Sequence, residues 1–337
     1  MPFAAYSRTF HRLFTGLSTA GPADERLPVR CSFATRAFAA RLRVPADVTA
    51  ALARFVRPRE TRLLLRRYAG RVPRRMPKFS ANLSFLFTEV PFLERFGEAA
   101  RAGFRAVEFG FAYDTPEREI AARLAEHDLA CVLINAPPGD LAAGERGLAS
   151  LPGREREFAA SIDTALRYAD ALGCPRIHVL SGVVPPDADE GERALRQSTL
   201  VRNLRAACTT ANARGVTLLV EALNPHDVPN YFFSTQAEAH TIRSEVGAAN
   251  LKVQMDLYHA EIVEGDCATT LERWLTHIGH IQVAGVPGRH EPDVGTLDYV
   301  GLMRRVDELG YDGWVGCEYR PLRDTASGLG WRERLVV

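Results

Sequence analysis

The chain has 337 residues, of which 46% are apolar, and its formal net charge is +1. It is long enough to bury a sizeable core, and no apolar run approaches the roughly 18 residues needed to cross a bilayer, which excludes a protein anchored by apolar membrane helices. The six cysteines are scattered, without a C-x-x-C pair or zinc-ligand spacing, so we expect reduced thiols in a cytoplasmic protein.

The net charge conceals two segments of opposite sign. Residues 1–75 contain sixteen Arg, no Lys and four acidic residues, whereas the remainder carries 26 basic and 37 acidic residues. An Arg-rich, acid-poor leader is typical of a transit peptide, a nucleic-acid-binding arm or translated DNA upstream of the true start. We favour the third interpretation, because a strand-like segment follows Met76 at once. We therefore expect a disordered or mis-assigned extension over 1–75 and one enzyme domain over 76–337.

From residue 76 onward, strand-like and helix-like segments alternate in chain order. Short apolar runs predict strands at 79–83, 106–109, 130–135, 176–180, 216–221, 251–256, 277–282 and 313–318. Amphipathic patterns predict helices at 89–102, 116–127, 154–172, 190–214, 235–246, 267–276 and 297–309. Ser234 and Asp266 are the expected N-caps of two of these helices. The loop over 136–152 is long enough that we expect it to cover a site or to be disordered.

This alternation predicts the fold class. Eight strands, each followed or preceded by a helix, are the pattern of a closed parallel (β/α)8 barrel, also called a TIM barrel. The main alternative is a doubly wound open sheet. It is disfavoured because no glycine-rich phosphate-binding loop follows any early strand.

Four of the predicted strands end in a polar residue, namely Glu221, Asp256, Gln282 and Glu318. In a parallel barrel the C-terminal ends of all strands surround one mouth, where catalytic groups lie. We therefore expect three carboxylates and one amide oxygen to converge. Such an oxygen set suits a hard divalent cation, Mg²⁺ above all or Mn²⁺, better than zinc.

Each of these residues has an ordinary interpretation when taken alone. A single Glu at a strand end is more often a solvated charge or an ion-pair partner than a ligand. Four polar residues at the ends of successive strands need another explanation. Carboxylates gathered in one mouth repel one another unless a cation or shared protons balance them. His259 and Arg289 follow two of these strand ends and could face a bound substrate. Taken alone, His259 would be interpreted as an ordinary hydrogen-bonded histidine and Arg289 as a solvated charge in a loop.

Ordered motifs span both halves of the predicted barrel. They include FSANLS (79–84), QMDLYH (254–259), GRHEP (288–292) and GWVGCEY (313–319). Together they resemble the hydroxypyruvate isomerase family, which belongs to the xylose isomerase-like barrels. The resemblance covers residues 76–329, and residues 1–75 have no counterpart in that family.

The resemblance implies roles for the polar residues at the mouth. It implies that Glu221 and Glu318 are the proton donor and acceptor. The divalent metal, often Mg²⁺, would be held by Glu221, Asp256, Gln282 and Glu318. Similarity to related sugar epimerases implies that His259 and Arg289 contact the substrate.

The implied activity is the interconversion of hydroxypyruvate and 2-hydroxy-3-oxopropanoate (tartronate semialdehyde) by metal-assisted proton transfer through an enediolate. The partner would be a small hydroxy-oxo acid, with no organic cofactor, nucleic acid or membrane, and the sequence leaves a homo-oligomer open. The alternatives are a 2-dehydrotetronate (2-oxo-tetronate) isomerase, a ketose 3-epimerase, an inactive binding barrel and a barrel endonuclease. The endonuclease is disfavoured because residues 76–337 are acidic overall and lack a His-rich zinc cluster.

Overall fold

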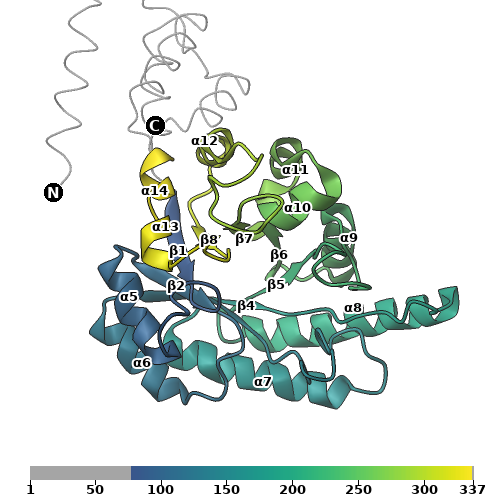
Figure 1. The fold of residues 1–337 in the computed structure, drawn as a ribbon. Coiled ribbons are helices and arrows are strands. Elements are labelled where there is room, and N and C mark those ends of the chain that lie inside the picture. Colours follow the sequence, from purple (N-terminus) through teal and green to yellow (C-terminus); the bar gives the residue numbers. More distant parts are fainter. Residues whose placement is uncertain (1–76, 336–337) are drawn as a thin grey trace, which may run out of the picture. The chain divides into compact units, whose positions relative to one another are not determined.

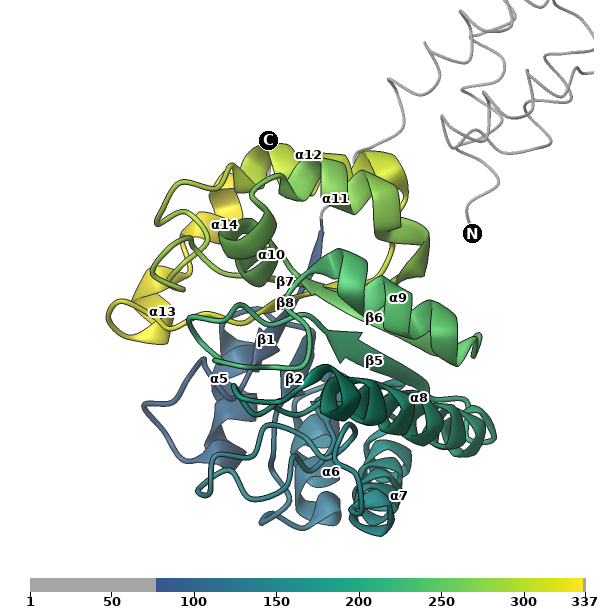
Figure 2. The same ribbon diagram turned by 90° about the vertical axis from the view of Figure 1, so that its right-hand side faces the viewer.

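The computed structural model describes residues 77–335, and the predictions made for residues 1–75 lie outside this range. Eight parallel strands close into a barrel in the order β1 to β8, with β1 paired to both β2 and β8 (Figures 1 and 2). The predicted (β/α)8 fold is confirmed. Among the described helices, none is long and apolar enough to cross a membrane.

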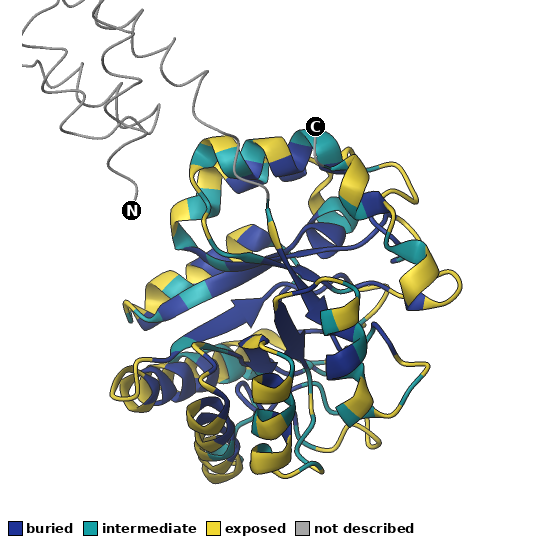
Figure 3. Cartoon of the chain, turned by 90° about the vertical axis from the view of Figure 1, so that its left-hand side faces the viewer, coloured by how far each residue is buried: buried dark blue, intermediate teal, exposed yellow. Residues whose placement is uncertain are grey.

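The strands agree with the predicted segments to within two residues at either end. They are β1 Lys78–Asn82, β2 Ala106–Phe109, β3 Ala130–Asn135, β4 Arg176–His178, β5 Thr217–Glu221, β6 Leu251–Asp256, β7 Ile278–Val283 and β8 Trp314–Cys317. Figure 3 shows the strands almost wholly buried, as expected when helices cover the outside of a parallel sheet. Because both faces are buried, the strands appear in the sequence as nearly continuous apolar runs.

The helices surround the barrel, with their exposed faces outward and their buried faces toward the strands (Figure 3). The main ones are α5 Arg95–Arg101, α6 Glu117–Glu126, α7 Glu155–Leu172, α8 Glu190–Asn212, α9 Gln236–Val246, α10 Leu257–Glu264, α11 Cys267–Trp274 and α12 Tyr299–Leu309. Short 3-10 turns, η1 Phe92–Glu94 and η2 Leu275–His277, extend two of them, and α13 Thr325–Gly328 and α14 Trp331–Arg334 follow the last strand.

Five of the seven predicted helix starts lie one to three residues too early, and two of these differences have a clear local cause. The first helix was expected from residue 89, but helical structure begins only after Pro91, which has an extended ψ of 149°. Val90 precedes this proline, and a residue before proline is disfavoured in the helical region. The cap of α9 is Thr235 rather than Ser234, because the Thr235 side chain accepts from the Glu238 backbone while the Glu238 side chain reaches back to Thr235.

Helix α10 was not predicted, and it begins directly where β6 ends. Asp256 is both the last residue of β6 and the N-cap of this helix, since its Oδ1 accepts a hydrogen bond from the Tyr258 backbone at 2.9 Å. The absence of any linker explains why the sequence pattern hides the boundary. This turn fixes the direction of the Asp256 carboxylate at the barrel mouth.

The long loop 136–152 packs over the end of β4. Its Ser150 backbone donates to the Ser181 carbonyl at 2.9 Å, and Gly147 lies against Leu180 with a φ of 118°. A side chain at residue 147 would meet the Leu180 carbonyl at 2.2 Å, so only glycine fits there. The loop therefore lies beside the C-terminal ends of the strands.

Candidate active site

The four predicted metal ligands lie at the C-terminal ends of β5 to β8. Glu221 and Asp256 are the last residues of β5 and β6, Gln282 is the penultimate residue of β7, and Glu318 follows β8 directly. Strand register brings Asp256 level with Gln282. The first three are buried, and the Glu318 side chain is 16% exposed. The structure therefore gathers all four at one mouth.

Glu318 is held by three nitrogen donors. Its Oε2 accepts from the side-chain amides of Gln282 at 2.6 Å and Asn82 at 2.7 Å. Its Oε1 accepts from Arg289 Nη2 at 2.6 Å, and the same nitrogen lies 3.6 Å from Asp256 Oδ2. Arg289 thus links the carboxylate after β8 to the carboxylate at the end of β6, and it supplies positive charge between them.

The three carboxylates have raised pKa values. Burial is the main cause for each, because a buried carboxylate loses its hydration. For Glu221, the negative charges of Glu318 and Asp256 raise the pKa further, well above its ordinary range. The pKa of Glu318 rises to about 8 and that of Asp256 to about 6, in both cases against the opposing influence of Arg289. Without a cation, the cluster favours bound protons.

The donor atoms of this cluster fit a divalent cation. Glu221 Oε1 and Asp256 Oδ2 are buried and have no hydrogen-bond partner among the described residues. Buried polar atoms without partners are costly, and carboxylate oxygens are the ligands that hard cations prefer. Together with the Gln282 and Glu318 oxygens, they would form the all-oxygen set predicted for Mg²⁺ or Mn²⁺.

A pH prediction follows from the raised pKa of Glu318. A carboxylate whose folded pKa exceeds its unfolded value stabilises the fold at low pH, and this stability is lost as pH rises through the folded pKa. Buried His178, with a pKa lowered to about 3, titrates in the opposite sense, but only below its ordinary 6.5. Between pH 6.5 and about 8, the metal-free protein should therefore lose stability, by up to about 1.4 kcal/mol per pH unit for each proton.

Urea unfolding with EDTA at both ends of this pH range measures that loss. Glu318→Gln removes one titrating group, so the variant should show a shallower decline than the wild type. Saturating Mn²⁺ should also flatten the wild-type profile, since a cation replaces the protons. A metal-free wild-type profile that is level over this range would contradict the raised pKa of Glu318.

His259 lies beside two of the carboxylates, and its hydrogen bonds define its role. One ligand atom each from Glu221, Asp256 and His259 lie within 4.8 Å of one another, which by distance alone suits a metal. However, His259 Nδ1 accepts from the Asn224 backbone N–H at 3.2 Å, so in the neutral ring Nε2 carries the proton. Burial and Arg289 hold the pKa of His259 well below its usual range, which keeps the ring neutral. Its Nε2 is therefore a donor, which suits a substrate oxygen better than a cation.

Arg289 is fixed from several sides. Its guanidinium lies 5.0 Å from the ring centroids of both Phe85 and Tyr258, and its Nη1 donates to Asp227 Oδ2 at 3.0 Å. Its backbone has a φ of 55°, in the left-handed region that non-glycine residues seldom adopt. Its Nε is buried and has no partner among the described residues. A planar donor group held in this way is ready for a carboxylate, but part of it is already paired with Glu318.

Comparison with known proteins assigns the barrel to a family. Residues 96–335 match the model of the xylose isomerase-like TIM barrel family. The chain belongs to this family. The membership expected from the sequence motifs is thereby confirmed.

Relatives of this xylose isomerase-like barrel carry isomerase names. The chain is 55% identical over 256 residues to the 2-oxo-tetronate isomerase of Cupriavidus necator, covering 76% of this chain and 97% of that protein. It is 43% identical over 258 residues to the hydroxypyruvate isomerase of Escherichia coli, and the match covers 77% of this chain and 99% of that protein. A crystal structure of a Brucella melitensis protein described as AP endonuclease, family 2, matches with a TM-score of 0.75 at 47% identity. This match covers 77% of this chain and 99% of that one. The predicted isomerase enzyme family is confirmed.

Sequence reasoning missed two buried residues inside this xylose isomerase-like barrel. His178, at the end of β4, places Nε2 3.5 Å from Glu221 Oε2, and burial followed by the influence of His280 lowers its pKa to about 3. Glu108 in β2 accepts hydrogen bonds from Gln282 and His280. Burial alone would raise the pKa of Glu108, but His280 and the hydrogen bonds lower it. The available signal was a single ionisable residue inside an otherwise apolar strand.

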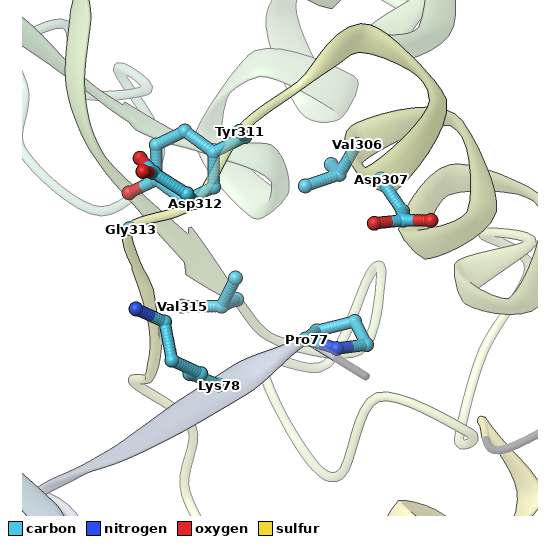
Figure 4. A pocket seen from close by; sticks show the side chains of 8 residues that line it. All are labelled: Pro77, Lys78, Val306, Asp307, Tyr311, Asp312, Gly313 and Val315. Atoms are coloured by element: carbon cyan, nitrogen blue, oxygen red, sulfur yellow. The ribbon is translucent and has the colours of Figure 1, made fainter. Parts of the chain in front are cut away.

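A separate cavity of about 330 Å³ lies away from these residues (Figure 4). Its lining comes from the N-terminal ends of β1 and β8 and from the end of α12, and includes Lys78, Val306 and Tyr311. In a parallel barrel this is the end opposite the catalytic mouth, where side chains contribute to stability. No residue of the carboxylate cluster lines it, so it has no part in the candidate active site.

Proposed function

We propose that the protein is a metal-dependent isomerase that moves a carbonyl group between adjacent carbons of a short 2-oxo acid. The observation that carries this proposal is the pair Glu221 and Glu318, two carboxylates of raised pKa that lie with Asp256 and Gln282 at the barrel mouth. Strands β6 and β7 lie between their strands in the closed barrel. The two carboxylates therefore approach the mouth from different directions, as proton transfer at two neighbouring carbons requires.

The reaction follows from the placement of these two groups. One carboxylate takes the proton from the hydroxyl-bearing carbon, and the other delivers a proton to the neighbouring carbonyl carbon. The hydroxyl proton passes to the former carbonyl oxygen, so the two isomers contain the same atoms. When bound, a divalent ion would supply stabilisation of the negative charge that develops on the substrate. The direction of reaction decides which glutamate acts first.

The remaining residues would orient the substrate. His259 presents a ring N–H beside Asp256, where it would donate to a substrate oxygen. Arg289 would bind the substrate carboxylate, because its planar guanidinium lies 5.0 Å from two aromatic ring centroids and its Nε has no partner among the described residues. Burial of the cluster excludes water, which strengthens each of these interactions.

We propose 2-oxo-tetronate as the preferred substrate and hydroxypyruvate as the second candidate. Both acids present the same reacting unit, a carbonyl beside a hydroxyl-bearing carbon and a carboxylate, and they differ by one terminal hydroxymethyl group. The four-carbon acid is favoured by the 55% identity to the 2-oxo-tetronate isomerase, against 43% to the hydroxypyruvate isomerase of Escherichia coli. Comparing kcat/KM on the two acids, with deuterium exchange from solvent into the substrate, tests both the substrate and the proton transfer.

The endonuclease interpretation has less support. The Brucella melitensis protein carries that description, but residues 76–337 carry 26 basic and 37 acidic residues. Among residues 77–335, only one group of His, Cys, Asp and Glu side chains has the spacing of a metal site. A phosphate backbone is bound by clustered positive charge, which an acidic barrel does not offer. Cleavage of an abasic DNA duplex by the purified protein would overturn this choice.

We also propose a cytoplasmic location. The five cysteines in the described part of the chain, Cys131, Cys174, Cys208, Cys267 and Cys317, are all buried and unpaired. Free thiols of this kind are typical of proteins in a reducing compartment. Fractionation of cells that produce the protein from its own gene tests the location.

Arg289→Lys should raise the KM for an acidic substrate by about tenfold or more, since an ammonium cannot reproduce a planar two-point contact. The motive is the guanidinium that contacts the rings of both Phe85 and Tyr258. Steady-state kinetics on 2-oxo-tetronate and on a neutral ketose separate the two roles. The acid should be affected more strongly, and equal effects on both compounds would show that Arg289 is structural.

A further inference from the structure

Glu108 lies in the barrel interior beneath the candidate active site and is fully buried. Its Oε2 accepts from Ser80 Oγ at 2.7 Å and faces His280 Nε2 at 2.8 Å. Its Oε1 accepts from the side-chain amide of Gln282 at 2.7 Å and, more weakly, from that of Asn82 at 3.4 Å. The two amide groups can only donate to a carboxylate, so Glu108 is bound as an acceptor.

The same two amides also bind the proposed catalytic carboxylate. Gln282 and Asn82 each donate to Glu318 Oε2, at 2.6 Å and 2.7 Å. Each NH₂ group therefore bridges Glu108 and Glu318. With both amide hydrogens of Gln282 engaged by carboxylates, its Oε1 must point to the other side, where it accepts from Gln254 at 2.7 Å.

The barrel makes room for this arrangement. Gly316 in β8 lies next to Glu108, and a Cβ atom there would come within 2.2 Å of Glu108 Oε1. Its φ is ordinary, so conformational freedom does not explain the glycine. The space for a neighbouring carboxylate explains it instead, because a methyl group would occupy the place of that oxygen.

We propose that Glu108 is a positioning residue, which holds the amides of Gln282 and Asn82 so that both donate to Oε2 of Glu318, and which thereby turns the Gln282 oxygen away from the two carboxylates. The inference rests on the proposed function. Glu108 touches neither the substrate nor the cation in this account. It acts through the two amides, and its negative charge beneath the mouth adds to the attraction for a divalent ion.

The first test is Glu108→Gln in the full chain, stripped of metal with EDTA and titrated calorimetrically with Mn²⁺ alone. We expect the affinity for Mn²⁺ to fall about tenfold to a hundredfold, the usual cost of changing a partner outside the ligand shell. We also expect kcat to fall by a similar factor while KM changes little, because substrate contacts remain. Glu308→Gln, on the outer surface of α12, is the matched control that removes one charge away from the network.

A second variant separates charge from position. Glu108→Asp keeps the charge but withdraws the carboxylate by one methylene group, so Mn²⁺ affinity should stay within a few-fold of wild type while kcat falls about tenfold. The Glu108→Asp variant also tests the proposal if Glu108→Gln does not fold. Melting temperatures of each variant are also measured with and without Mn²⁺. If Glu108 were purely structural, its substitution would lower both melting temperatures equally and leave the Mn²⁺ affinity and kcat unchanged.

The proposal would be overturned if substitution of Glu108 lowered only the melting temperatures. Wild-type Mn²⁺ affinity together with wild-type kcat in folded Glu108→Gln would overturn it as well. The Mn²⁺ titration needs no substrate. A failure of the proposed substrates would therefore leave the metal result in place, and wild-type Mn²⁺ affinity in folded Glu108→Gln would refute the proposed effect of Glu108 on the cation site even if the isomerase activity were established.

Discussion

Glu221→Gln and Glu318→Gln are each expected to lower kcat by at least about a hundredfold, the common scale of general acid–base catalysis. Glutamine preserves the volume and one oxygen but cannot accept or deliver a proton. Both side chains lie at the mouth with raised pKa values, which suits groups that exchange protons near neutral pH. Steady-state kinetics on 2-oxo-tetronate and hydroxypyruvate measure the loss.

The matched control is Glu291→Gln. Glu291 is also a buried glutamate, 4% exposed, but its carboxylate accepts from the Leu322 backbone in a loop contact outside the carboxylate cluster. Its substitution should lower the melting temperature and leave kcat within a few-fold of wild type. Near wild-type turnover in either Glu221→Gln or Glu318→Gln, measured on folded protein, would make the two-carboxylate mechanism wrong.

Asp256→Asn is expected to weaken Mn²⁺ binding by at least about a hundredfold, beyond the usual cost of changing a residue outside the ligand shell. Asp256 Oδ1 caps helix α10, so an asparagine oxygen would keep that hydrogen bond with Tyr258. The asparagine NH₂ would then replace Oδ2, which accepts no hydrogen bond from the described residues, and would face the cation. The change therefore removes a charged ligand while it preserves the local fold.

Calorimetric titration with Mn²⁺ measures this loss, with Asp227→Asn as the control. Asp227 binds Arg289 Nη1 at 3.0 Å but is not among the expected ligands, so its substitution should change the affinity only a few-fold. Gln282→Glu should also weaken binding less than Asp256→Asn, because it adds a charged oxygen. An Asp256→Asn variant with wild-type affinity would remove Asp256 from the metal site.

The sequence predicts most of the barrel because parallel strands bury both faces and so appear as short apolar runs. The placement of Glu221, Asp256, Gln282 and Glu318 at one mouth follows from the same rule, since all strands of such a barrel end on one side. Local boundaries are harder to predict. Helix α10 has no linker before it, and its cap is a residue that the pattern assigns to a strand.

The network beneath the mouth could not be predicted from periodicity. Glu108, His178 and His280 each interrupt an apolar strand, and a lone ionisable residue in such a run gives no indication of its partner. The partners come from strands far apart in the chain, as the contact between Glu108 in β2 and Gln282 in β7 shows. Only the closure and stagger of the barrel determine which interior side chains meet.

The bridging amides also bear on how this site can change over evolutionary time. Asn82 and Gln282 each bind two carboxylates, so an exchange at either position strands several buried acceptors at once. The Phe85 side chain contacts the Arg289 guanidinium without a hydrogen bond, so its substitution leaves no acceptor unpaired. We therefore expect that substitutions which change the preferred substrate occur in the loops around the mouth, whereas the two bridging amides beneath it are retained.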